Sequence, residues 1–510
     1  MYDGAGSNVS NAWLLRKWLQ HCDNHHSGCE RKRNFWPKRI IFFDSSISGK
    51  LTLVEKQFSG EDYLVLSHCW GNPTPDDKSQ FCTTWENYSR RRLEGFSSDD
   101  LPKTFQDAIE ITRALGKQYL WIDALCIIQG DGGDWESQAN TMQDIFANAY
   151  CTIAATSAHS WIDGFLKPQS DPLDGQTQNY STPSPCECDF DKDVDEGPLM
   201  KRAWVLQERV LSRRTIHFTG SHVYCECGDG VICEQLTKLK PPFGKQYFIL
   251  DPQFPNRLYT SGYERTVQFI QFLFEKYSAS GITEETDRAI AINSLIKRIE
   301  QALETGSHYG IFQPFLSSLL LWKRTRDNNP PIEYSHYGIF QPFLSSLLLW
   351  KRTRDNNPPI EYKKQVPSWS WMAYSGGIDF ILKPTDQFLV PRRDDLYFAH
   401  DGRALNIKVR NFGEGCLAEK RGAEYIILNG TEEVGSLRLD MANLMQLDNC
   451  NCVVVGTVGN IQEDARKDYY ILVIRDKHGD IRQDKRYERV GVGKVQARFV
   501  SIDCTLGTLW

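Results

Sequence analysis

The spacing of apolar residues predicts an ordered series of strands and helices in the first third of the chain. Residues 63–70 and 119–127 are short apolar runs bounded by turn residues, a pattern typical of strands buried on both faces of a parallel sheet. Apolar residues at three- and four-residue steps predict helices over 101–115 and 135–149. A third strand is predicted at 151–156. This alternation predicts a doubly wound α/β unit with parallel strands.

The ends of both predicted helices carry recognisable signals. Pro102 suits the first turn of one helix, and Gly116 suits its C-terminal stop. Asp134 can cap the helix that begins at Trp135. These signals support the predicted boundaries.

The rest of the chain falls into segments that differ in composition and in hydrophobic pattern. Residues 167–200 are rich in Pro, Ser, Asp and Gln and lack periodicity, so we expect a long surface loop there. A helix at 202–211, a strand at 215–218 and apolar helical faces within 262–302 are predicted next, before short alternating runs typical of β-structure. The resulting domain prediction is an N-terminal Cys/His segment with lead-in strands (1–59), an α/β domain (60–220), a mainly helical region (221–366) and a β-rich region (367–510).

One segment of the helical region occurs twice. Residues 307–334 and 335–362 are identical over 28 positions, because His308 and His336 are 336 − 308 = 28 residues apart. Structural repeats diverge, and solenoids need about three units to bury a core. We therefore interpret the two copies as a recent duplication or a gene-model error. Only one copy is expected to pack natively, and the copy at 335–362 is predicted to be that one.

Composition excludes several classes of protein. The formal charge of −6 argues against a nucleic-acid module that relies on phosphate neutralisation. No apolar run reaches the ~18 residues of a membrane span, and the N-terminus lacks the features of a secretory signal. The fifteen cysteines are scattered and are expected to be reduced thiols, buried or metal-bound. A cytoplasmic protein is therefore expected.

Three blocks of the sequence resemble the fungal heterokaryon incompatibility family, or HET domain. The first block, residues 63–71, is similar to the family's Tyr-x-x-Leu-Ser-Tyr/His-x-Trp-Gly. The second runs from Leu101 through Ala149. The third, residues 202–212, is similar to Arg-Gly-Trp-Thr-Leu-Gln-Glu-Arg-Leu-Leu-Ser, with Ala203 and Val205 in place of the Gly and Thr.

The resemblance implies a fold and a function. It implies a flavodoxin-like or Toll/interleukin-receptor-like parallel sheet, and a role in fungal non-self recognition and programmed cell death. The implied partners are other incompatibility proteins or a second copy of the chain, and no cofactor is required. Because some Toll/interleukin-receptor domains cleave NAD through a glutamate, the resemblance also raises NAD as a substrate, an argument by fold analogy.

Two carboxylates are the candidate catalytic residues. Glu136 lies in the first turn of the predicted helix after the second strand, and Asp123 interrupts an otherwise apolar strand. Either carboxylate could stabilise an oxocarbenium-like centre or activate water. The structural alternatives are that Glu136 only complements the helix dipole, and that Asp123 pairs with Arg202 or a backbone amide.

Other polar residues are expected near these carboxylates, because ligands bind beyond the carboxyl ends of parallel strands. Cysteine catalysis through His68 and Cys69 is disfavoured, since successive strand residues point to opposite faces. Residues of the third block could instead form a polar network that holds this block against the sheet. The candidate ligand-binding residues are Ser67, His68, Trp70, Gly71, Gln129, Arg202, Gln207 and Glu208.

A cluster near the N-terminus has the spacing of metal ligands. Cys22, His26 and Cys29 follow a C-x3-H-x2-C pattern. Three ligands do not complete a tetrahedral zinc site, so a fourth would come from His25 or from a cysteine of the run C-x-C-x5-C at 225–233. The alternative is a helix end with unpaired thiols.

Overall fold

The chain forms two compact units. By residue contacts, one comprises Met1–Arg257, Gly281–Thr283 and Ile290–Ser294, and the other Leu258–Ser280, Glu284–Ala289 and Leu295–Trp510. None of the helices described has both the length and the apolar character needed to cross a bilayer. The computed structural model describes residues 12–30, 35–43, 49–55, 60–166, 188–239, 251–282, 288–325, 367–373, 377–382, 389–440, 447, 450–458, 467–477 and 485–510.

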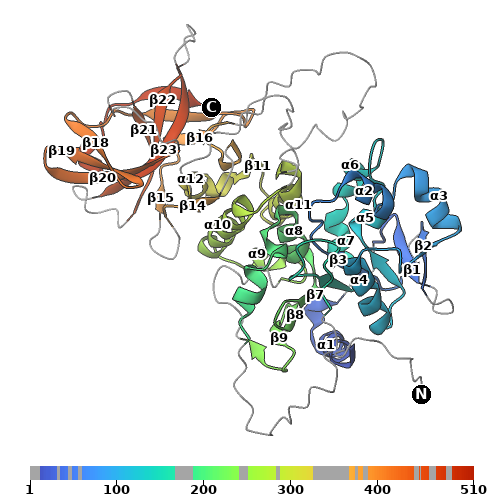
Figure 1. Ribbon diagram of the computed structural model, residues 1–510. Helices are drawn as coiled ribbons and strands as arrows, with labels where there is room; N and C mark the ends of the chain where they lie inside the picture. Colours follow the sequence, from blue (N-terminus) through green and yellow to red (C-terminus); the bar gives the residue numbers. More distant parts are fainter. Residues whose placement is uncertain are drawn as a thin grey trace, which may run out of the picture. The chain divides into compact units, whose positions relative to one another are not determined.

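A mixed sheet organises the first unit (blue to green in Figure 1). Among the described residues its strand order is β10-β9-β8-β7-β6-β3-β5-β1-β2-β4. The strands are β1 (Ile40–Phe43), β2 (Lys50–Val54), β3 (Leu64–Ser67), β4 (Phe96–Ser97), β5 (Tyr119–Trp121), β6 (Cys151–Ala154), β7 (Arg214–Phe218), β8 (Val223–Cys227), β9 (Gly230–Cys233) and β10 (Lys238–Leu239).

The centre of this sheet is parallel, as predicted. β3 pairs in parallel with β5 on one side and with β6 on the other, and β6 pairs in parallel with β7. All four residues of β3 are buried, which explains its continuous apolar run. The connection from β3 leads to one neighbour and the next connection returns past β3, so the strand order reverses at β3. The sheet continues beyond residues 60 and 220 through antiparallel wings.

The helices of this unit follow the predicted pattern except over 135–149. Apolar residues at three- and four-residue steps in α4, including Phe105, Ala108 and Ile109, are buried. Gly116 follows α4 with φ +71° and ends it, as predicted. The helices and helical turns of this unit are α1 (Ala12–His25), η1 (Ser27–Cys29), α2 (Pro75–Phe81), α3 (Trp85–Leu93), α4 (Lys103–Ala114), α5 (Asp123–Cys126), α6 (Trp135–Ala139), α7 (Met142–Asn148), η2 (Asp191–Asp195), η3 (Leu199–Lys201) and α8 (Ala203–Leu211).

Two predicted elements are interrupted. The strand predicted over 119–127 ends at Trp121, and the short helix α5 begins at Asp123, whose carboxylate accepts the N–H of Ala124. Such a local side-chain bond competes with the strand pattern. The helix predicted over 135–149 is broken between α6 and α7. There the Thr141 hydroxyl donates to the carbonyl of Gln138 at 2.8 Å, a local hydrogen bond that competes with the helical pattern.

The Asp134 side chain does not cap α6, although Asp134 occupies the N-cap position. Its carboxylate instead binds the guanidinium of Arg39 at 2.6 Å and accepts the N–H of Ile128 at 2.9 Å. Arg39 is buried. The capping prediction is therefore wrong, because a charged partner distant in sequence takes the carboxylate.

The segment around the third block is partly as predicted. The predicted helix at 202–211 and strand at 215–218 are confirmed as α8 and β7. Of the predicted loop, residues 167–187 lie outside the described part. Residues 188–200 contain the turns η2 and η3, and Val194 and Leu199 there are buried.

The second unit is helical at its start and β-rich at its end, as predicted. Residues such as Val454, Ile471 and Val495 form its core. The short α9 (Asn256–Tyr259) lies where the two units meet in sequence. The elements that follow are α10 (Tyr263–Ala279), α11 (Arg288–Ala302), β11 (Ser307–His308), β12 (Ile311–Phe312), α12 (Leu316–Leu320), β13 (Trp322–Arg324), β14 (Ile378–Phe380), β15 (Leu389–Pro391), β16 (Leu396–Phe398), β17 (Leu405–Val409), β18 (Cys416–Arg421), β19 (Glu424–Asn429), β20 (Glu432–Leu439), β21 (Asn451–Val458), β22 (Asp468–Asp476), β23 (Arg486–Gln496) and β24 (Thr505–Leu509).

The described part of the first copy of the 28-residue repeat, residues 307–325, packs in the second unit. Its β13 pairs with β14, and Leu319 and Trp322 have no exposed surface. The Trp322 indole donates to the carbonyl of Trp369 at 3.0 Å. The prediction that the copy at 335–362 docks concerns residues outside the described part.

Candidate functional site

The candidate residues of the first block lie at the carboxyl end of β3. Ser67 is the last residue of β3, and His68 follows it at the point where the strand order reverses. Asp123 comes two residues after the end of the parallel neighbour β5. Such a reversal is where open α/β sheets bind ligands, so the topology brings these residues to the expected edge.

Ser67 and Glu208 join the first block to the third. The Ser67 hydroxyl donates to Oε2 of Glu208, which α8 carries beneath the strand end. Burial raises the pKa of Glu208 to about 7, although the hydrogen bond from Ser67 and the charge of Arg202 act in the opposite direction. Glu208 therefore changes protonation near neutral pH, which is the property of a proton-exchanging group.

His68 is buried against helix α4. Its ring packs edge-on against Phe105 of α4, with ring centroids 5.0 Å apart. Burial lowers the pKa of His68 to about 4, against the charge of Asp123, and Arg202 lowers it further. The imidazole is therefore neutral at physiological pH. Its Nε2 lies 3.8 Å from Oδ1 of Asp123, beyond hydrogen-bond distance.

Arg202 links the start of α8 to the sheet edge at the end of β3. Its guanidinium donates to the carbonyl oxygen of His68. Together with the bond between Ser67 and Glu208, this contact holds the third block against β3. Of Arg202, Gln207 and Glu208, which the sequence suggested as a polar network, Arg202 and Glu208 make these contacts. Gln207 has no hydrogen bond among the described residues.

The Asp123 carboxylate has two hydrogen-bond partners in the described part of the chain. Its carboxylate accepts the indole N–H of Trp70 at 2.8 Å and the backbone N–H of Ala124 at 2.7 Å. The backbone amide was one of the partners expected from sequence, and Trp70 was not. The Gln129 amide lies near by, 3.5 Å from the carbonyl of Asp123. These bonds orient Asp123 toward Trp70.

Two aromatic rings, those of Trp161 and His68, lie beside the indole of Trp70. The ring of Trp161 lies 5.3 Å from that of Trp70 at an angle of 30°, and the His68 ring lies 6.4 Å away at 16°. Trp161 belongs to the loop after β6, and no local sequence pattern predicts this contact. Trp70 itself is half-buried.

Gly71 is required by the backbone at the end of the first block. Its φ is +71°, and a Cβ atom there would lie 2.6 Å from Cβ of Ser160. Both the conformation and the close approach favour glycine. Gly71 therefore acts by shaping the loop rather than by contacting a ligand through a side chain.

Gln207 is a buried amide without a partner among the described residues. Only 1% of its surface is exposed, and neither its Nε2 nor its Oε1 has a hydrogen bond there. A buried unsatisfied amide costs about 1–3 kcal/mol. Such a group is a candidate for contact with a ligand or partner.

Glu136 is the second residue of α6, and its side chain lies outside the described part. The neighbouring Trp135 packs against Trp204 of α8, with ring centroids 5.6 Å apart. The start of α6 is thus adjacent to the helix that carries Glu208 and Gln207.

The cysteines near this edge are unsuited to nucleophilic catalysis. Burial raises the pKa of Cys126 to about 12 and also raises the pKa of Cys69. A thiol with a raised pKa has little thiolate at neutral pH. This agrees with the sequence argument against a Cys/His hydrolase.

The metal-ligand candidates come together at another place in this unit. The ligand atoms of Cys22, His26, Cys29 and Cys227 all lie within 4.8 Å of one another. Of the fourth ligands that the sequence left open, the structure thus brings in Cys227, and His25 is not part of the cluster.

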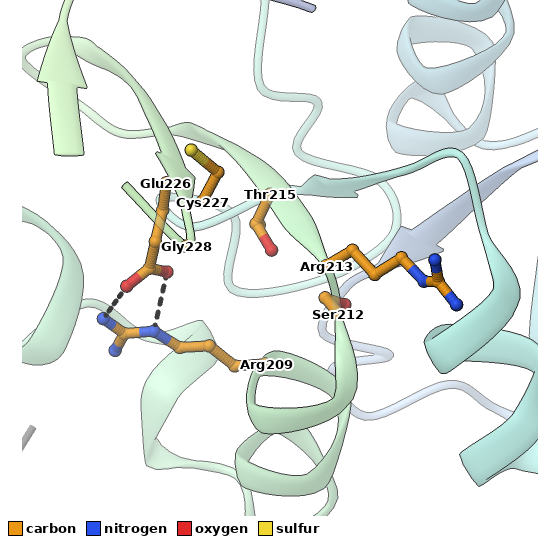
Figure 2. Close-up of a pocket in the computed structure, with 7 residues that line it drawn as sticks. All are labelled: Arg209, Ser212, Arg213, Thr215, Glu226, Cys227 and Gly228. Atoms are coloured by element: carbon orange, nitrogen blue, oxygen red, sulfur yellow. Dashed lines mark hydrogen bonds and ion pairs between the residues drawn. The ribbon is translucent and has the colours of Figure 1, made fainter. Parts of the chain in front are cut away.

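An ion-pair network next to this cluster was not foreseen. Arg209 binds both carboxylate oxygens of Glu226, at 3.0 and 2.9 Å, and His217 contacts the same carboxylate at 2.8 Å. Figure 2 shows Arg209 and Glu226 on the wall of a small pocket that Cys227 also lines. The pocket is small, with about 200 Å³ of space that includes open solvent.

Comparison with known families identifies the segment that contains β3 through α8. Residues 63–208 match the family model described as heterokaryon incompatibility protein (HET). The chain carries a HET domain. No curated protein and no solved structure matches the chain. The resemblance carried by the three sequence blocks is therefore confirmed, and the contacts of Ser67, Arg202 and Glu208 join the first and third blocks of the HET domain.

Proposed function

We propose that this protein is a heterokaryon incompatibility factor that acts in fungal non-self recognition and triggers cell death through its HET domain. The observation that carries the proposal is the match of residues 63–208 to the HET family. The protein acts in the cytoplasm by contact with another incompatibility protein or with a second copy of itself.

The geometry at the end of β3 supports an interaction module better than an enzyme. Ser67 and Glu208 bond to each other, and Asp123 bonds to Trp70. His68, Ser67 and Glu208 are all buried. Groups that bond to one another inside the domain hold its blocks in position, whereas a catalytic site exposes them to substrate.

Expression of the full chain from an inducible promoter in a filamentous fungus tests the proposal. We expect growth arrest and uptake of a vital dye after induction. Val65→Asp is the control, because a charge at a position with no exposed surface in β3 prevents folding. Normal growth with the wild-type chain, or equal toxicity of the Val65→Asp chain, contradicts the proposal.

The second candidate function is NAD cleavage with Glu136 as the essential carboxylate. It is favoured by one juxtaposition: Trp135 contacts Trp204 of α8, so the start of α6 lies beside the helix that carries Glu208. In this alternative Glu136 stabilises the charge that develops on the ribose during glycosidic cleavage.

The chain offers a matched control for this alternative. Glu86 is the second residue of α3 and follows Trp85, just as Glu136 is the second residue of α6 and follows Trp135. Both charges favour a helix N-terminus by a similar small amount. If the protein cleaves NAD, Glu136→Gln abolishes nicotinamide release and toxicity, and Glu86→Gln preserves both. Toxicity that survives Glu136→Gln supports the interaction module.

A further inference from the structure

Three segments of the chain, of which the third is distant in sequence from the first two, bring three cysteines and one histidine to one point. Cys22 lies in the last turn of α1, and His26 follows that helix. Cys29 ends η1, and Cys227 ends β8. Cys227 is 227 − 22 = 205 residues beyond Cys22. The three cysteines are nearly fully buried and pack together, and the exposed fraction of the His26 side chain is 14%.

The distances fit tetrahedral coordination. With metal–sulfur and metal–nitrogen bonds of about 2.3 and 2.05 Å, neighbouring sulfur and nitrogen ligands lie about 3.6 Å apart. Cys227 Sγ lies 3.5 Å from Nδ1 of His26. All four ligand atoms are within 4.8 Å of one another, so a small movement closes the set around one ion.

The surroundings of the four ligands complete the pattern of a metal centre. His26 uses Nδ1 toward the sulfurs, while its Nε2 lies 3.3 Å from the Asp229 carboxylate. A ligating histidine commonly donates its other ring N–H to a carboxylate in this way. The backbone N–H groups of Gly228 and Asp229 donate to the sulfurs of Cys29 and Cys227. Lys238 binds Asp229 at 2.6 Å and holds it in place.

We propose that Cys22, His26, Cys29 and Cys227 bind one structural zinc ion. Three thiolates and one imidazole are a common zinc set, and soft thiolates disfavour magnesium and calcium. Four protein ligands fill the tetrahedron and leave no position for water or substrate, so the ion has no catalytic role.

The site extends the folded unit beyond the HET match. Two of its segments precede residue 63 and the third follows residue 208. The zinc ion therefore fastens α1 and η1 to the hairpin of β8 and β9 and closes a loop that contains the whole HET domain. The ion stabilises this arrangement because the unfolded chain has no preformed site.

Metal analysis of the purified full chain tests the proposal. We expect about one zinc per chain in the wild type and a loss of most of it in Cys227→Ser and His26→Ala. The matched controls are Cys225→Ser, a buried cysteine two residues away on β8, and His25→Ala, an exposed neighbour of His26. Both controls retain about one zinc per chain.

Cobalt replacement keeps the test decisive if a ligand variant does not fold. The wild-type chain is stripped with a chelator and titrated with Co²⁺. We expect the visible bands of tetrahedral cobalt and the near-ultraviolet bands of thiolate–cobalt bonds, which one equivalent of Zn²⁺ abolishes. Wild-type protein without zinc or tetrahedral cobalt bands, a disulfide between two of the three cysteines, or equal loss of zinc in Cys225→Ser overturns the proposal.

Discussion

At the scale of single residues, two buried glutamates behave in opposite ways because their partners differ. Burial raises the pKa of both. Glu226 nevertheless titrates at about 2, since Arg209 and His217 contact its carboxylate directly. The main partner of Glu208 is the hydroxyl of Ser67, and its pKa stays raised to about 7. The groups that contact each carboxylate, rather than its depth of burial, therefore determine its charge at neutral pH.

Glu208→Gln is predicted to remove a pH dependence of stability. The folded pKa of Glu208 is about 7 and the ordinary value is 4.5, so the unfolded chain loses this proton first. Stability therefore falls as pH rises from about 4.5 to about 7. Gln keeps the acceptor for Ser67 without ionising. Relative to wild type, the variant gains about 3 kcal/mol between pH 4.5 and pH 8 in urea unfolding.

The control for this prediction is Glu226→Gln. It leaves the buried Arg209 without its bidentate partner, and breaking such a pair costs about 3–5 kcal/mol. We expect Glu226→Gln to destabilise the protein at pH 8, where Glu208→Gln gains most. Parallel pH profiles of wild type and Glu208→Gln contradict the assignment.

At the scale of elements, the sequence predicts what local signals determine. The apolar run of β3, the stripe of α4 and the stop at Gly116 are all local, and all are confirmed. The Asp134 carboxylate was misassigned to a cap because Arg39 lies 95 residues away.

The candidate site was predictable to a similar extent. The position of Ser67 and Asp123 at one sheet edge follows from parallel topology. The hydrogen bond between Ser67 and Glu208 does not follow from the topology. The two residues are 141 positions apart, and neither local pattern specifies the pair. Likewise the C-x3-H-x2-C spacing indicated three ligands, and only the folded sheet selects Cys227 from the available cysteines.

Gly71→Ala is predicted to destabilise the exit from β3 more than Gly132→Ala destabilises its own turn. Both glycines have nearly the same φ, +71° and +70°, so both substitutions carry the left-handed penalty of about 1–2 kcal/mol. Only Gly71 also meets Ser160, at 2.6 Å, whereas Gly132 has no atom within 4 Å. The clash adds about 1–3 kcal/mol. Equal losses in thermal unfolding contradict the role of Ser160.

At the scale of the whole molecule, the duplicated segment makes two deletions equivalent. Removing 307–334 or 335–362 leaves the same chain of 510 − 28 = 482 residues, because the copies are identical and adjacent. The first copy already supplies β11, β12, α12 and β13 to the second unit. We expect the shortened chain to match the thermal stability of the full chain, and a large loss shows that both copies are structural.

Paired substitutions are predicted to show that either copy can occupy the site of the first. Trp322 is fully buried, with the Arg489 guanidinium 3.5 Å from its ring centroid, and Trp350 is its counterpart in the second copy. Truncating such a tryptophan costs about 3–5 kcal/mol. If the second copy docks in place of the first, the loop before the docked copy becomes 28 residues longer and the loop after it 28 residues shorter. This change costs under about 1 kcal/mol of the free energy of unfolding. Trp322→Ala and Trp350→Ala alone should therefore each lose less than about 1 kcal/mol in urea unfolding, and the double variant should lose the full amount, a strongly non-additive result. A full loss in Trp322→Ala alone shows that the copies do not exchange.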